Sequence, residues 1–408
     1  MSQNRYYICV TPFFPSPSSW RGAYVYDQVK AIERNSDYKV LVFKPGQGED
    51  YEIKGIKVYR YKTRSFPSNI LNGFFNDYNG RSFVRRVNEL GVDLSNVAFV
   101  HCHVCMNAAC GLALKRLNPN IKVLVQHHDL DPLNLRNGVI LRNNRLNIRY
   151  RARKAIKLFN EVDLHICISE PCKENLLSFP QKEEGEVYAD YIRALDLCNG
   201  LPCVKTKDVC VLNNGVDTNL FKKRGWHPEG NKTSKEFRIG CIANFNDLKD
   251  HITLIKAFEI FAEKTAKKNV RLSLLGSGET RVMCENYIRE HQLDKYVEWP
   301  KEVPHDKLPE YYHSLNLFVL PSYFEGFGCV YTEAAACGIP FMGVYNQGAA
   351  EVISPDESSM WLIQPHDYNR LAELIIQFYT KRYAQTLCKP FDIDVLIKDF
   401  LENIVDLK

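Results

Sequence analysis

The chain has 408 residues and a formal net charge of +5, and its hydrophobic and charged fractions of 45% and 25% are typical of a soluble globular protein. This length exceeds one ordinary hydrophobic core, so two domains are expected. No signal pattern follows Met1, and no apolar run approaches the ~18 residues of a membrane span, which predicts a cytoplasmic protein. The 14 cysteines are scattered without a compact framework, which favours reduced, buried thiols over disulfides.

Apolar segments in the first half alternate between strand-like and helix-like patterns. A Pro/Ser loop at 12–19 separates the first strand from a helix that begins near Gly22. Such alternation predicts a parallel, doubly wound sheet, whose ligands gather at the carboxyl ends of the strands. Residues 180–207 are interpreted as an irregular insertion, and the polar segment 224–235 as an interdomain linker. Strands are expected at 6–10, 39–43, 97–100, 123–126, 164–168 and 209–212, with a hairpin at 53–59.

The second half repeats the pattern and predicts a second α/β domain. Two doubly wound domains facing each other would leave one deep cleft between them. Expected strands lie at 237–242, 271–275, 297–299 and 315–320, and expected helices at 252–264, 281–291 and 308–313.

The most informative stretch follows the expected strand at 315–320. Gly326 and Gly328 allow a close backbone approach, and Gly338 followed by Pro340 is a helix stop signal, so a helix is predicted from about 328 to 337. The positive N-terminal end of this helix would attract an anion.

Glu325 and Glu333 bracket this turn, and two interpretations compete. Glu325 could cap the helix while Glu333 is a solvated surface residue. However, Glu333 precedes three alanines in a helix with few polar positions, which favours a side chain that faces a cleft. Hydroxyl groups of a ligand are the natural partners of such carboxylates.

With these segments placed, the second half resembles the retaining, nucleotide-sugar-dependent glycosyltransferases of family 4, which have the GT-B architecture of two Rossmann-like domains facing across a cleft. The resemblance covers about 167–353. It implies an acceptor-binding domain at 1–222, a donor-binding domain at 223–385, and a C-terminal helical segment at 386–408 that packs back on the first domain. The matching motifs are the glutamate pair in Glu325-Gly326-Phe327-Gly328 and Glu333, the turn Asn213-Asn214-Gly215-Val216-Asp217, the pair Gly276-Ser277-Gly278, and the base-binding loop from Val297 to Pro304 that includes Val303.

The resemblance implies roles for individual donor-site residues. Glu325 would contact hydroxyls of the donor sugar, Glu333 the ribose hydroxyls, and Lys249 the diphosphate leaving group. Asn244 stands where the family usually has an arginine, and an amide carries no charge, so another cation could be needed for the phosphates. The backbone N–H groups near the sugar and pyrophosphate would be those of Phe327, Gly328 and Cys329, with Gly276 in the glycine pair.

In the first domain, Gly22 resembles the glycine of a loop that approaches donor phosphates and acceptor. His128 resembles a histidine at a strand end that faces the donor sugar, and it is preferred over His127 because Asp129 follows it. The implied reaction is retaining transfer to a saccharide or lipid-linked saccharide acceptor in bacterial polysaccharide or glycoconjugate assembly, with no cofactor and no metal. Alternatives are a nucleotide-sugar epimerase of the same fold and a non-catalytic carbohydrate-binding relative, which only Asn244 supports.

Two further patterns allow metal binding. Asp129-Leu130-Asp131 spells a metal-binding pattern of another glycosyltransferase fold, but its position favours chance and helix capping. His101, His103 and Cys105 alternate along one strand, with His127 or His128 nearby, and could bind zinc. We favour a structural role in which His101 lines the cleft and the other side chains pack.

The segment Arg136–Lys157 carries eight cationic residues and no acidic one, interleaved with aliphatic side chains. It could be a solvated face, or an interfacial helix on an anionic membrane that presents a lipid-linked acceptor. The second alternative requires aliphatic side chains such as Ile148, Ile156 and Leu158 to be exposed. Nucleic acid is not expected, because the overall charge is balanced.

Overall fold

The structure is a computed structural model that describes residues 5–67, 70–128, 130–133, 145–181, 189–223, 236–266, 269–404 and 407. The chain divides into two compact units. Unit 1 comprises Met1–Asn214 and Ile393–Lys408, and unit 2 comprises Gly215–Asp392. The divisions therefore fall at 214/215 and 392/393, beside the expected 222/223 and 385/386. The proposed linker at 224–235 lies outside the described residues.

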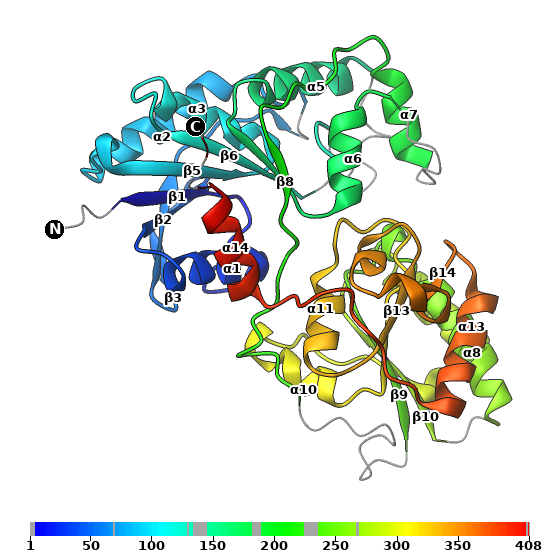
Figure 1. Cartoon of the computed structure of the whole chain (residues 1–408). Helices are drawn as coiled ribbons and strands as arrows, with labels where there is room; N and C mark the ends of the chain where they lie inside the picture. Colours follow the sequence, from blue (N-terminus) through cyan, green and yellow to red (C-terminus); the bar gives the residue numbers. More distant parts are fainter. Residues whose placement is uncertain are drawn as a thin grey trace. The chain divides into compact units, whose positions relative to one another are not determined.

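Unit 1 is built on an eight-stranded sheet with the order β3-β4-β2-β1-β5-β6-β7-β8 (Figure 1). Neighbouring strands pair in parallel, except that β3 and β4 form an antiparallel hairpin, as the sequence predicts. The strands are β1 Tyr6–Val10, β2 Lys39–Pro45, β3 Tyr51–Ile53, β4 Ile56–Tyr61, β5 Val97–His103, β6 Lys122–His127, β7 Leu164–Cys167 and β8 Val209–Val211.

The helices of unit 1 include one that comes from the far end of the chain. This helix, α14, lies beside α1 (Figure 1), and its Ile397 and Phe400 join a buried cluster with Tyr7 of β1. Arg34 of α1 also pairs with Asp394 of α14 at 3.0 Å. The helices of unit 1 are α1 Ala23–Arg34, α2 Asn76–Glu89, α3 Ala108–Lys115, α5 Arg145–Phe159, α6 Glu170–Ser178, α7 Ala189–Leu197 and α14 Ile393–Ile404.

The interpretation of 180–207 as an irregular insertion is wrong for its middle part, because α7 lies there. Tyr191, Ala194 and Leu195 of α7 are buried, which is the pattern of a helix with one face against the core.

Unit 2 is built on a six-stranded sheet with the order β11-β10-β9-β12-β13-β14, in which all recorded pairs are parallel. The strands are β9 Phe237–Ile242, β10 Val270–Leu275, β11 Val297–Glu298, β12 Leu317–Val319, β13 Phe341–Val344 and β14 Leu362–Ile363. The helices are α8 His251–Lys264, α9 Arg281–Glu290, α10 Leu308–His313, α11 Cys329–Ala336, α12 Ser358–Trp361 and α13 Tyr368–Lys381.

The predicted fold class is confirmed: each unit is an α/β domain around a largely parallel sheet, as in Rossmann-like folds. The central strands β5 and β12 are fully buried, because both faces of each sheet are covered there. The carboxyl ends of parallel strands lie at one edge of each sheet, so the loops after β1 and β6, and those after β9, β10 and β12, are the candidate ligand sites. None of the described helices is long and apolar enough to cross a membrane.

Candidate active site

The loop between β12 and α11 is fixed by hydrogen bonds to two other segments. The hydroxyl group of Ser322, which is fully buried, donates to the carbonyl of Leu248 at 2.9 Å, and Tyr323 N–H donates to the same carbonyl at 3.1 Å. On the other side, Glu325 N–H donates to Gln347 Oε1 at 2.8 Å. The loop is therefore held in one conformation between the 3-10 turn Asp247–Lys249 and the segment after β13.

Gly328 makes the start of α11 possible. Its φ of 75° lies in the left-handed region, and a Cβ added there would lie 2.6 Å from the Tyr331 ring and 3.0 Å from Glu325 Cγ. The observed helix, Cys329–Ala336 with caps at 328 and 337, confirms the predicted span. Its first N–H groups have no partners within the helix and point toward the carboxyl edge of the sheet. Phe327 is buried, whereas Cys329 is partly exposed.

Glu325 forms an ion pair with Lys249, whose ammonium group donates to Glu325 Oε2. Both side chains are mostly buried, with 16% and 20% of their surfaces exposed. The recorded partner of the Glu325 carboxylate is thus Lys249, and the interpretation of Glu325 as a helix cap stays a prediction. The structure thus brings together two of the predicted catalytic residues at the carboxyl edge of unit 2.

Glu333 lies one turn further along α11 and is 9% exposed. The buried hydroxyl group of Tyr312 donates to Glu333 Oε2 at 2.7 Å. Burial raises the pKa of Glu333 to about 7, and the hydrogen bond from Tyr312 partly opposes that rise. The interpretation of Glu333 as a solvated surface residue is therefore wrong.

The glycine pair after β10 packs against the loop after β9. A Cβ on Gly276 would lie 2.0 Å from the Ala243 carbonyl oxygen, and one on Gly278 would lie 2.2 Å from that of Phe245. Phe245 N–H also donates to the Ser277 carbonyl at 2.9 Å. These contacts place Asn244, which is exposed, next to Gly276 in the same pair of loops.

Val303 is partly buried in the loop that follows β11. In the same loop, the Trp299 ring lies 5.6 Å from that of Phe245, and the Arg281 guanidinium lies 4.6 Å from the Trp299 ring centroid. Arg281 also donates to the carbonyl of Gly276 at 3.2 Å. A cation that the sequence did not single out therefore lies beside the glycine pair.

His251, the first residue of α8, stacks on Phe245 with ring centroids 3.8 Å apart and is 2% exposed. Burial lowers its pKa to about 3, so the ring is neutral near pH 7. It supplies packing beneath the glycine pair rather than charge.

In unit 1, Gly22 lies at the N-terminus of α1 with a φ of 90°. A Cβ there would lie 2.5 Å from the backbone carbon of Phe13, so only glycine fits. Gly22 is itself buried, and its contact with 13–14 joins the loop after β1 to the start of α1.

His128 follows β6 and belongs to a row of rings. Its Nε2 lies 2.8 Å from Nδ1 of His103, the His103 ring stacks at 4.5 Å on His101, and His101 Nδ1 lies 2.7 Å from the hydroxyl group of Tyr7. Burial lowers the pKa of His101 to about 3 and also lowers that of His103, so both are neutral near pH 7. The expectation that His101 lines a cleft is wrong, because it is 1% exposed.

His127 belongs to a separate buried network. Its Nδ1 lies 2.9 Å from Asp131 Oδ2, its Nε2 lies 2.9 Å from His165 Nδ1, and His165 Nε2 donates to the Phe159 carbonyl at 3.1 Å. Asp131 therefore holds a histidine. Asp129 and the residues from 134 to 144 lie outside the described residues, so the helix-capping interpretation stays a prediction. Within the ranges that the structure describes, no group of three or more His, Cys, Asp or Glu side chains could hold a metal ion.

The basic segment is described only from Arg145 onward, where it forms α5. Ile148, Ile156 and Leu158 are 4%, 3% and 7% exposed, so the expectation of exposed aliphatic side chains is wrong for them. Arg149 donates to the carbonyls of 197 and 199, at 3.0 and 2.7 Å. The apolar face of α5 therefore packs on unit 1.

Two family descriptions match the chain, and their order agrees with the two units. Residues 22–187 match the family described as Glycosyltransferase Family 4, and residues 222–390 match Glycosyl transferases group 1. Together the two matches include most of both units. The chain belongs to the GT-B glycosyltransferases of the family 4 type.

Among curated proteins, this glycosyltransferase is 27% identical over 223 residues to the capsular polysaccharide biosynthesis glycosyltransferase CapM of Staphylococcus aureus, a match that covers 54% of the chain and 53% of CapM. The matches to the curated relatives cover between 10% and 66% of the relatives' own lengths.

Solved structures share the fold at low sequence identity. A sucrose-phosphate synthase from Thermosynechococcus elongatus superposes with a TM-score of 0.68 at 17% identity, and the match covers 98% of this chain and 94% of the other. HepE from Anabaena, determined in complex with UDP and glucose, superposes with a TM-score of 0.65 at 17% identity, and the match covers 98% and 99%.

Proposed function

We propose that this glycosyltransferase transfers a sugar from a nucleoside diphosphate sugar to an acceptor hydroxyl group with retention of the anomeric configuration. The observation that carries the proposal is the group formed by Lys249, Glu325 and Glu333 around the N-terminus of α11. It offers one cation, two carboxylates and the backbone N–H groups at the start of a helix, which match a diphosphate and two sets of sugar hydroxyls. HepE was determined with UDP and with UDP-glucose, which makes these the first ligands to test.

In this proposal, the departing diphosphate gains negative charge, and the ammonium group of Lys249 and the N–H groups of 327–329 stabilise it. Glu325 accepts hydrogen bonds from hydroxyls of the donor sugar. Glu333, together with Tyr312, holds the ribose hydroxyls. Gly276 and the exposed Asn244 border the phosphates, and the loop with Val303 contacts the base.

Retention requires no protein nucleophile in this scheme. The acceptor hydroxyl attacks from the face that the diphosphate leaves, and a departing phosphate oxygen takes its proton. The positive groups at the phosphate make a metal ion unnecessary, so transfer should continue in excess EDTA. We assign His128 to the donor sugar and Gly22 to the loop that borders it, and no cofactor is needed.

The acceptor is a saccharide or a lipid-linked saccharide in this proposal, consistent with an assembly role like that in CapM's name. Contact with an anionic membrane stays a prediction. Of α5, the exposed Leu146, Arg153 and Lys157 could take part, whereas the buried aliphatic side chains could not.

The test is donor binding and donor cleavage with matched variants. UDP should raise the unfolding temperature of the wild-type protein, and UDP-glucose with an acceptor should release UDP. Glu325→Ala should reduce transfer at least a hundredfold, because it removes sugar contacts and leaves Lys249 unpaired. Glu373→Ala, which also breaks an ion pair in unit 2, with Arg370 of α13, is the control and should keep transfer within about threefold.

Full transfer by the Glu325→Ala variant would refute the site. Binding of UDP-glucose followed by release of an altered nucleotide sugar, without free UDP, would instead show an epimerase.

A further inference from the structure

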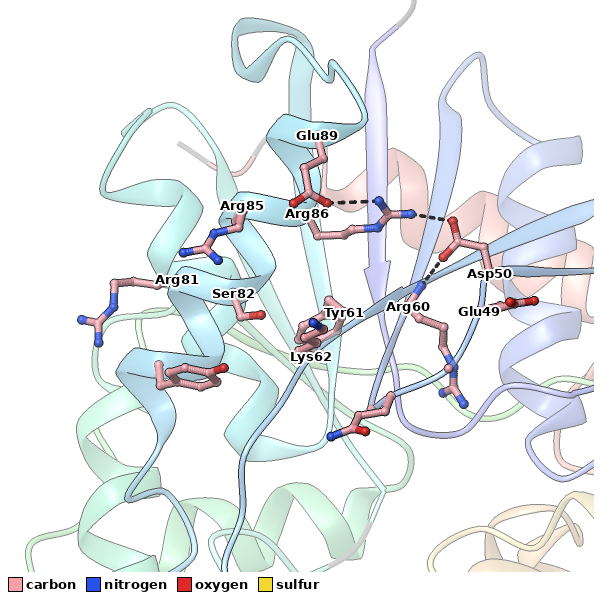
Figure 2. Close-up of a pocket in the computed structure, with 14 residues that line it drawn as sticks. Glu49, Asp50, Arg60, Tyr61, Lys62, Arg81, Ser82, Arg85, Arg86 and Glu89 are labelled. Atoms are coloured by element: carbon pink, nitrogen blue, oxygen red, sulfur yellow. Dashed lines mark hydrogen bonds and ion pairs between the residues drawn. The ribbon is translucent and has the colours of Figure 1, made fainter.

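A pocket lies in unit 1, apart from the residues assigned to donor binding and catalysis. Its volume is about 700 Å³, within the range of small-ligand sites. It lies at the carboxyl ends of β2 and β4, which pair in parallel through Pro45 and Tyr61, and α2 closes its other side (Figure 2). Because β1, β2, β5 and β6 are parallel, this is the edge of the sheet at which Gly22 and His128 also lie.

The pocket is lined by more cations than its own carboxylates can neutralise. Arg86 is already paired, since it contacts Asp50 at 2.5 Å and Glu89 at 3.2 Å. Asp50 also accepts from the backbone N–H of Arg60 at 2.8 Å, and Figure 2 shows these groups as one connected set. Two of the pocket's three acidic side chains, Asp50 and Glu89, are therefore occupied by Arg86, while the third, Glu49, is exposed.

Three other cations remain available. Arg81 and Arg85, four residues apart, extend from one side of α2, whereas Arg86 extends toward Asp50 (Figure 2). Lys62 follows the end of β4. All three are exposed, and none of the three side chains forms a hydrogen bond or ion pair with another residue in the described parts of the chain.

We propose that this pocket binds an acidic group, carboxylate or phosphate, of the saccharide acceptor. The guanidinium groups of Arg81 and Arg85 can each donate to the planar or tetrahedral oxyanion of such a group, and Lys62 adds a third cation. A concave surface with an excess of positive charge also raises the local concentration of an anionic ligand. Ligand binding along this edge places the acidic residue of the acceptor on the same side of the sheet as His128.

Naming the ligand as the acceptor rests on the proposed transferase function, whereas anion binding itself does not. Filling the donor site with UDP distinguishes a failure of the proposed function from a failure of the anion-binding proposal. Calorimetric titrations in saturating UDP use 4-nitrophenyl β-D-glucuronide against its neutral glucoside, and glucose 6-phosphate against glucose. If UDP does not bind, the donor proposal fails. The same titrations without UDP then still show whether the pocket binds an anion.

We expect at least one charged probe to bind at least tenfold more tightly than its neutral partner, and the pair that does so identifies carboxylate or phosphate as the preferred group. The double variant R81E/R85E should weaken that binding at least tenfold. R81Q/R85Q should weaken it in the same direction, which guards against a folding defect from charge reversal. Arg116→Glu, a charge reversal on the exposed surface beyond α3, is the control and should stay within twofold.

The proposal is overturned if charged and neutral probes bind equally, if no probe binds, or if both double variants retain wild-type affinity. The proposal is also overturned if Arg116→Glu weakens probe binding as much as the double variants do, because the loss of affinity would then reflect the overall surface charge of the protein.

Discussion

Replacement of Glu333 by glutamine should make the protein more stable at pH 8 and at the same time a weaker nucleotide binder. Burial raises the pKa of Glu333 from 4.5 to about 7. Between these two values the Glu333 carboxyl group is ionised in the unfolded chain but still protonated in the folded protein. The free energy of unfolding therefore falls as the pH rises from 4.5 to 7. Above pH 7 the whole cost is present, because both states are ionised and the folded carboxylate is poorly solvated.

A shift of this size corresponds to about 3 kcal/mol, at ~1.4 kcal/mol for each pKa unit. Glutamine carries no charge at any pH, and its Oε1 can still accept the hydrogen bond from Tyr312. Its buried amide N–H₂ loses about 1 kcal/mol if it finds no acceptor. The expected result of Glu333→Gln is therefore a gain of about 2 kcal/mol at pH 8, where the charge cost is removed, and a loss of about 1 kcal/mol at pH 4.5, where only the amide penalty remains.

Urea unfolding at pH 5 and pH 8 measures this difference in stability between the variant and the wild-type protein. The fluorescence of Trp299 and Trp361 in unit 2 reports the unfolding. Glu290→Gln, at an exposed position on α9, is the control and should change stability by less than about 0.5 kcal/mol at either pH. Affinity of the Glu333→Gln variant for UDP should fall about tenfold or more, because a carboxylate contact to ribose is lost. An equal stability difference at both pH values, or a less stable variant at pH 8, would refute the assignment of a costly buried carboxylate.

Two further substitutions test individual loops. Gly22→Ala should destabilise the protein by more than about 2 kcal/mol in thermal or urea unfolding, since it adds a 2.5 Å contact to the strain of a positive φ. Gly55→Ala shares a positive φ but meets nothing within 4 Å, so it should lose only about 1 kcal/mol, and equal losses would disprove the steric argument. Asn244→Arg should tighten UDP binding by about two- to fivefold at low salt and less at high salt. Asn286→Arg, which adds the same charge elsewhere on unit 2, should not, and a matching gain there would point to net charge alone.

The apolar runs and the turn residues made much of the fold predictable. Strands β1 and β9 lie where the sequence places them, and α11 begins and ends beside the predicted glycine and stop signals. Local signals suffice there, because a buried parallel strand is a short apolar run between turns. Segment 180–207 was misinterpreted because its charged and cysteine residues obscured the one buried face of α7.

The α5 segment shows how a charge count can mislead. Ile148, Ala152, Ala155, Ile156 and Phe159 recur at helical spacing and form one buried face. That stripe predicts packing on a core, but the sequence interpretation weighed the many cations around it and considered only a solvated face or an interfacial membrane helix. The position of an apolar stripe decides burial, whereas the number of charges between its members does not.

The candidate site was predictable where chemistry is carried by a local motif and not where it depends on contacts across the fold. Glu325 and Glu333 belong to one continuous strand-turn-helix motif, so their spacing can be seen in the sequence. The partner Tyr312 comes from α10, before the strand, and Arg281 from α9, and no spacing in the sequence relates them to the motif. Their positions follow only from the order of strands in the unit 2 sheet.

The ion pair of Lys249 and Glu325 limits how strongly phosphate can be held in the absence of the usual arginine. Lys249 already donates to a carboxylate, so a diphosphate gains only the difference between its own attraction and that of Glu325. Asn244 adds no charge, and Arg281 is engaged with Glu285, the Gly276 carbonyl and the Trp299 ring. Under the proposed function, much of the binding energy for the donor must then come from the N-terminus of α11 and the ribose contacts of Glu333. The buried Glu333 carboxylate therefore lowers the stability of the free protein, and in this proposal it contributes a large part of the binding free energy of the donor.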